Sequence, residues 1–181
     1  MRLPRRASFS RTVPAERAGA EREVAAPEVA GARLRRYIAA VTTALYNRDI
    51  LRLAASIPHH GRLDRPQASV EKRSPLCGSR VIVDVLLDDE GRVAQLGQVV
   101  KACALGQASA SLMGAHAIGR GLDELAEARD SLAGFLAGTR DDPGGWPGLD
   151  IFREARPYKA RHKSILLAFE AAAEAVERAG G

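Results

Sequence analysis

The stretch SPLCGSRVIVDVLLDDEGRV at residues 74–93 decides the fold. Every second residue is apolar from Val81 to Leu87, and polar residues such as Arg80 and Asp84 stand between them. This is the period of a half-buried strand. The letters DDEG then predict a turn, and residues 92–102 predict a strand that runs back. A short turn between two strands implies an antiparallel hairpin.

The residues before the hairpin predict three further elements. Residues 45–56 predict a short amphipathic helix, 58–67 a Pro/Gly loop and 68–74 a further strand. Gly97 interrupts the returning strand and suggests a bulge there.

Helical patterns follow the hairpin. We expect helices over residues 104–119, 121–137 and 161–178, with a Gly/Trp/Pro loop at 138–150. Strands that come first and helices that come afterwards indicate an α+β fold, here a small antiparallel sheet of about three strands packed against helices.

The charge is uneven along the 181 residues. The chain carries a net charge of +5. Of its 27 basic and 22 acidic residues, 18 of each lie after residue 40, so residues 41–181 are neutral and the whole excess lies in residues 1–40. We therefore expect residues 1–40 to be a disordered basic extension and 41–181 to be the folded domain. A neutral domain gives no support to a nucleic-acid partner. No apolar run is long enough to span a membrane, so no membrane partner is expected either.

The extension leaves two interpretations open. Its first fifteen residues contain Arg and Ser but no Asp or Glu, a composition that resembles a mitochondrial presequence. The chain as a whole has 23 Arg and four Lys, the bias of a GC-rich bacterial gene, where a leader of this composition has no targeting role. The bacterial interpretation places the protein in the cytoplasm.

The candidate metal ligands in the sequence are Cys77, Cys103 and His162. Cys77 precedes one hairpin strand and Cys103 follows the other, so antiparallel pairing places both at one edge of the sheet. His162 begins the last helix and shares an inward stripe with Ile165 and Phe169. This predicts a shared metal site, although a buried Cys is often only a small apolar residue and a lone His is usually hydrogen-bonded.

Other polar residues have ordinary structural explanations. We expect His59 and His60 to be solvated, and His116 and Ser109 to pack within the fold. Trp146 is expected to anchor its loop by burying its ring.

The segments at 74–93 and 101–120, the latter reading KACALGQASASLMGAHAIGR, resemble the NifU N-terminal/IscU/SufU family of iron–sulfur cluster assembly scaffolds. Cys77 and Cys103 match the first two cysteines of that family. ARHKSILLAFEAA at 160–172 is similar to its third-cysteine segment, with His162 on the family His and Lys163 where the Cys stands. Ser79 stands where the family has Asp.

The resemblance implies a scaffold, not an enzyme. It implies that Cys77, Cys103 and His162 bind iron or a labile iron–sulfur cluster, with zinc as a further candidate, and that the partners are a cysteine desulfurase and client apoproteins. Lys163 is then expected to stabilise the thiolates electrostatically.

Two alternatives stay open. A degenerate family member would bind zinc or only the desulfurase and regulate assembly without carrying a cluster. An enzyme would use a Cys nucleophile with His162 as its base, but no third orienting group is identifiable.

Overall fold

The computed structural model describes residues 45–75 and 77–181, so the predicted extension over residues 1–40 lies outside the described residues. The elements follow the order α2 (Arg48–Ala55), β1 (Ala68–Arg73), β2 (Arg80–Leu87), β3 (Val93–Lys101), α3 (Ala104–His116), α4 (Leu122–Ala137), the 3-10 helix η1 (Leu149–Ala155) and α5 (Lys159–Gly180). The three strands pair antiparallel in the order β1-β2-β3. The predicted α+β architecture is confirmed.

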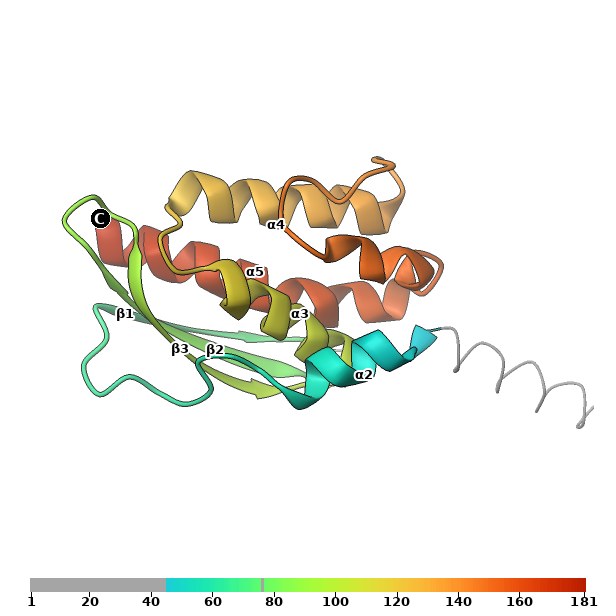
Figure 1. The fold of residues 1–181 in the computed structure, drawn as a ribbon, viewed down its shortest axis with the longest axis horizontal. Coiled ribbons are helices and arrows are strands. Elements are labelled where there is room, and N and C mark those ends of the chain that lie inside the picture. Colours follow the sequence, from blue (N-terminus) through green and yellow to red (C-terminus); the bar gives the residue numbers. More distant parts are fainter. Residues whose placement is uncertain (1–44, 76) are drawn as a thin grey trace, which may run out of the picture. The chain divides into compact units, whose positions relative to one another are not determined.

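The helices lie against one face of the sheet (Figure 1). Helix α5 runs between the sheet and α4, and it contacts β1, β2, α3 and α4. Because it has neighbours on several sides, its buried residues are spread around the helix. Among the described residues, no helix is long and apolar enough to cross a membrane.

The element boundaries follow local chemistry. Helix α2 begins after Asn47, whose side-chain oxygen accepts a hydrogen bond from the Ile50 amide at 2.9 Å. The predicted inward face of β2 is confirmed, since Val81, Val83 and Val85 are all fully buried. The 3-10 helix η1 starts inside the segment that was predicted to be a loop.

The outward face of the sheet is more buried than predicted. Asp84 belongs to the polar side of β2, yet it is fully buried. Its carboxylate accepts hydrogen bonds from Arg62 Nε at 2.6 Å and from the Leu63 amide at 3.1 Å. The loop after α2 therefore lies over this part of the sheet. These hydrogen bonds outweigh desolvation, which alone would raise the pKa of Asp84, and hold that pKa below its usual value.

Gly97 has a different role from the predicted bulge. It pairs regularly with Asp84, and the irregularity between β2 and β3 falls at Leu86/Leu87. A Cβ on Gly97 would lie 3.0 Å from the Gly61 carbonyl oxygen and 3.0 Å from the Leu63 amide nitrogen. The prediction of a bulge at Gly97 was wrong: the glycine provides room for the loop that covers the sheet.

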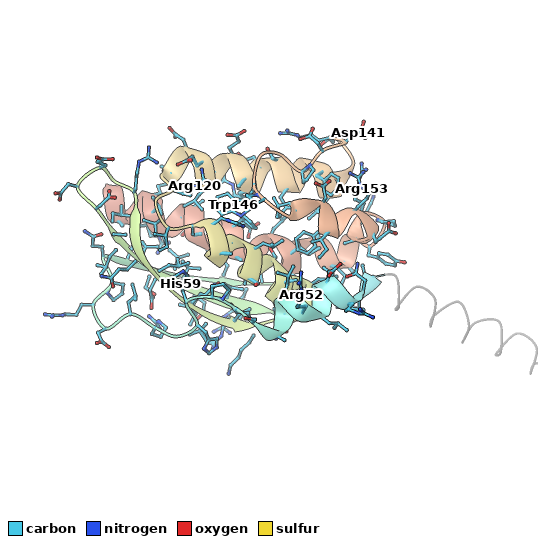
Figure 2. All side chains as sticks on the ribbon, in the orientation of Figure 1. Arg52, His59, Arg120, Asp141, Trp146 and Arg153 are labelled. Carbon is cyan, nitrogen blue, oxygen red and sulfur yellow. The ribbon has the colours of Figure 1, made fainter. Side chains whose placement is uncertain are left out.

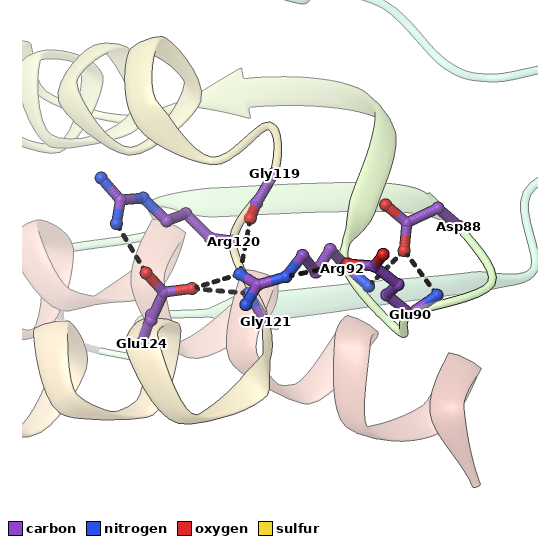
Figure 3. Close-up of polar contacts among 7 residues, drawn as sticks. All are labelled: Asp88, Glu90, Arg92, Gly119, Arg120, Gly121 and Glu124. Carbon is purple, nitrogen blue, oxygen red and sulfur yellow. Dashed lines mark hydrogen bonds and ion pairs between the residues drawn. The ribbon is translucent and has the colours of Figure 1, made fainter.

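An ionic network closes the end of the hairpin where β2 turns into β3 (Figure 3). Arg92 Nη1 donates to the Gly119 carbonyl at 2.9 Å and to Glu124 at 3.1 Å. Glu124 also accepts from Arg120 at 2.6 Å. These contacts join the β2–β3 turn to the turn between α3 and α4.

Trp146 anchors the long loop as predicted. The residue is only 7% exposed, and its Nε1 donates to the Leu112 carbonyl at 3.1 Å. It packs edge-on against Phe169 at 5.3 Å between ring centroids. Figure 2 shows Trp146 beneath α4 near Arg120, whose guanidinium lies 5.8 Å from the ring centroid.

Gly106 sets how closely α3 approaches α5. A Cβ at this position would lie 2.5 Å from Ser164 Oγ and 2.9 Å from the Ser164 carbonyl oxygen. Real Cβ atoms do not approach other atoms so closely, and one of the two contacts is with backbone. The two helices can adopt this spacing only with glycine here.

We expect Gly106→Ala to lower the free energy of unfolding by about 1–3 kcal/mol, because the added methyl overpacks the α3–α5 contact. The sign opposes helix propensity, which favours Ala over Gly by about 0.5–1 kcal/mol within a helix. Urea unfolding followed by circular dichroism measures the change. Gly145→Ala is the matched control, since nothing lies within 4 Å of a Cβ there. A Gly106→Ala protein as stable as the wild type would show that the contact is not tight.

Candidate metal-binding site

The hairpin brings the two cysteines to one edge of the sheet. Arg80 at the start of β2 pairs with Lys101 at the end of β3. Cys77 lies three residues before Arg80, and Cys103 lies two residues after Lys101 as the N-cap of α3. The predicted placement of these two residues is therefore confirmed.

Two serine hydroxyls connect the two thiols. Cys77 Sγ is 3.0 Å from Ser79 Oγ, Ser79 Oγ is 3.0 Å from Ser164 Oγ, and Ser164 Oγ is 3.4 Å from Cys103 Sγ. Both serines are buried, whereas both cysteines are half-buried and free. Both cysteine residues are thus partly exposed, and two buried hydroxyls lie beside their sulfur atoms.

The surroundings of Cys77 favour its thiolate. Burial raises the pKa of this thiol, but the nearby hydroxyls of Ser74, Ser79 and Ser164 and the Ser79 amide outweigh burial and lower the pKa from 9.0 to about 7. Of these groups, the Ser79 hydroxyl forms a hydrogen bond with Cys77 Sγ, at 3.0 Å.

His162 does not join the two cysteines in the structure. Its Nε2 lies 3.2 Å from the Ala155 carbonyl oxygen and 3.0 Å from that of Arg156, at the end of η1. Residues 162 and 164 are about 200° apart around a helix, so His162 and Ser164 face opposite sides of α5. Its role as a metal ligand stays a prediction. Residues 45–75 and 77–181 contain no group of three or more His, Cys, Asp or Glu placed to hold a metal ion.

Lys163 is paired with a carboxylate. Its Nζ lies 2.8 Å and 2.7 Å from the two carboxylate oxygens of Glu170, one helical heptad further along α5. The expectation that this ammonium stabilises the thiolates is not supported, because its charge is balanced by Glu170.

Ser164 is the site residue that sequence analysis missed. It is fully buried in α5 and contacts both Ser79 and Cys103. A stripe of inward-facing residues could not identify it, because α5 is buried on several sides. The one sequence signal for this contact was the run of small residues in α3, where Gly106 permits α5 to approach closely.

The remaining histidines have the solvated or packing environments predicted for them. His59 and His60 are exposed in the loop over the sheet, as predicted, and His59 is labelled in Figure 2. His116 packs edge-on to Trp146 at 6.4 Å. Ser109 donates to the Ile165 carbonyl at 2.5 Å, in the packing role expected of it.

The donor set at the sheet edge suits a soft metal. Cysteine sulfur favours iron, zinc and iron–sulfur clusters, and two cysteines lie here at the two ends of the serine pair. Hydroxyl oxygens are poorer ligands for these metals, so the described residues offer an incomplete and open coordination shell.

We expect the alkylation rate of Cys77 by iodoacetamide to reach half its maximum near pH 7, because only the thiolate reacts. Ser79→Ala shifts this midpoint upward, because it removes a hydrogen bond that stabilises the charged form. Mass spectrometry of the modified peptides separates Cys77 from Cys103. Ser111→Ala, which changes a buried serine bonded to the Ser56 carbonyl, serves as the control. A Cys77 midpoint at or above pH 9.0 would contradict the assigned environment.

Comparison with known proteins identifies relatives in sequence and in structure. No protein-family model matches the chain. The chain is 27% identical over 134 residues to the iron–sulfur cluster assembly scaffold protein IscU of Thermotoga maritima, covering 74% of this chain and 94% of that protein.

Two solved structures share the fold. A nitrogen-fixing NifU-like protein (N-terminal) from Brucella abortus superposes with a TM-score of 0.72 at 39% identity, covering 77% of this chain and 97% of the other. The SUF-system scaffold FiSufU from Fervidobacterium islandicum gives 0.69 at 21% identity, covering 75% and 98%. Sequence identity over nearly the whole Brucella chain, together with the shared fold, shows that this protein belongs to the NifU N-terminal/IscU/SufU family of iron–sulfur cluster assembly scaffolds.

Proposed function

We propose that the protein is an iron–sulfur cluster assembly scaffold, which holds iron or a labile iron–sulfur cluster as cargo on Cys77 and Cys103 and delivers it to client proteins. The observation that carries this proposal is the pair of half-buried thiols joined through Ser79 and Ser164. Family membership supports the identity of the cargo, and the position of the two cysteines at one sheet edge supports this location for it.

The geometry suits a carrier better than a permanent metal site. Structural metal sites are closed by four strong protein ligands, whereas the described edge offers two thiols and two neutral hydroxyls. His162 stays a predicted third ligand that would have to leave the carbonyl groups of Ala155 and Arg156. Cargo held by few strong ligands is more easily transferred to a client.

The same proposal includes the partners. A cysteine desulfurase would supply sulfur, and client apoproteins would receive the assembled cluster. Both cysteines are partly exposed, which leaves the edge of the sheet accessible to another protein. The proposal places the protein in the cytoplasm, where thiols are kept reduced.

The role proposed is that of a carrier without catalytic turnover. A nucleophilic cysteine needs a base within hydrogen-bond reach. The only histidine assigned to this site by sequence, His162, hydrogen-bonds instead to main-chain carbonyls. The neighbours of the thiols are serine hydroxyls, which stabilise a thiolate but do not serve as a general base.

Anaerobic reconstitution with ferrous iron and sulfide tests the proposal. We expect the wild type to bind iron and sulfide and to gain visible absorbance. Cys77→Ala and Cys103→Ala should each retain at least about tenfold less iron, because each removes one of the two strong ligands. Iron and sulfide analysis after gel filtration gives the stoichiometry.

His60→Ala controls for adventitious binding, since His60 is an exposed potential ligand outside the site. It should bind as much iron as the wild type. Iron retention that is unchanged in both cysteine variants would exclude a cluster at this edge. Zinc without iron in the natively purified protein would favour a regulatory family member that carries no cluster.

A further inference from the structure

Ser164 lies with Ser79 between the two thiols, on the side of Cys103. This side chain is fully buried, and its hydroxyl lies 3.4 Å from the Cys103 sulfur and 3.0 Å from the Ser79 hydroxyl. Ser79 in turn contacts the Cys77 sulfur. Any metal bound by both sulfurs would therefore sit next to Ser164.

The fold holds Ser164 in place. It lies in α5, which packs against α3. A Cβ on Gly106 of α3 would lie 2.5 Å from Ser164 Oγ, so the absence of a side chain at Gly106 leaves the space that this hydroxyl occupies beside Cys103. Lys163 and His162, its two predecessors in α5, are engaged with Glu170 and with main-chain carbonyls.

Ser79 and Ser164 offer one hydroxyl donor for each of the two sulfur atoms. Each serine carries one O–H donor. With both thiols protonated, Cys77 donates to Ser79. Once both sulfurs are deprotonated, Ser79 can donate to Cys77 and Ser164 to Cys103. Two hydroxyls thus supply the two donors that a pair of thiolates needs.

We propose that Ser164, and not His162, is the third side chain of the metal-binding site, where it orients the Cys103 thiolate and occupies the corner that a third ligand would take. The inference rests on the proposed function and adds a residue that sequence analysis did not assign. A neutral hydroxyl binds soft metals more weakly than a thiolate. Ser164 therefore keeps the site labile.

The experiment uses Co²⁺ as the probe, added anaerobically to the full chain in competition with a chelator. Ser164→Cys should bind Co²⁺ at least about tenfold more tightly and should show a stronger sulfur-to-cobalt charge-transfer band, because a third thiolate joins the site. Ser164→Ala should bind about tenfold more weakly, the size of effect seen when a group supporting a ligand is lost.

Two controls make the result specific. Ser111→Cys adds a third thiol at a buried position of α3 away from the site, and it should leave Co²⁺ affinity unchanged. His162→Ala should also leave the affinity and the band unchanged. Far-ultraviolet circular dichroism checks that each variant is folded. If Ser164→Cys is too large to fold against α3, Ser164→Ala still decides the question, because it is smaller than serine.

The outcomes separate the two proposals. A wild type that binds no Co²⁺ overturns both. If the wild type binds Co²⁺ and Cys77→Ala does not, the two-cysteine site stands. In that case, a loss of affinity in His162→Ala with no change in folded Ser164→Ala would overturn the assignment of Ser164 alone.

Discussion

The antiparallel pairing of β2 with β3 is the constraint on which the site depends. With Arg80 opposite Lys101, the turn that bears Cys77 and the N-cap that bears Cys103 meet at one edge. A slip of one residue would turn the buried valines of β2 outward, so burial of those side chains enforces the register. At the other end of the hairpin, Arg92 and Glu124 tie the turn to the helical layer (Figure 3). Hydrophobic burial therefore indirectly fixes the spacing of the two thiols.

Helix α5 adds the second constraint. It is covered by the sheet and by two helices, so its first turns reach the cysteine edge, η1 and solvent from neighbouring positions. Consecutive residues consequently have unrelated roles: His162 bonds to η1, Lys163 pairs with Glu170, and Ser164 meets Cys103. The absence of a side chain at Gly106 is what lets the last of these approach. The hydroxyl of Ser164 therefore reaches Cys103 from the same helical turn in which His162 and Lys163 face elsewhere.

Sequence patterns predicted the hairpin, the helices and the meeting of the two cysteines, because period and turn chemistry are local signals. They did not predict the burial of Asp84 or the role of Gly97, since both depend on a loop folding over the sheet from outside the hairpin. They also did not predict the contact between Ser164 and Cys103. An inward stripe identifies the buried side of a helix that packs on one neighbour, but it cannot distinguish between several neighbours. The family resemblance supplied the chemistry in advance, yet it aligned residues without showing where their side chains point.

X-ray absorption at the zinc edge, on wild-type protein loaded with one equivalent of Zn²⁺, tests most directly whether both sulfurs share one metal. Two sulfur neighbours at about 2.3 Å, with the remaining shell made of lighter atoms, is the predicted result. A shell with a single sulfur, or with none, would mean that Cys77 and Cys103 do not bind the same ion.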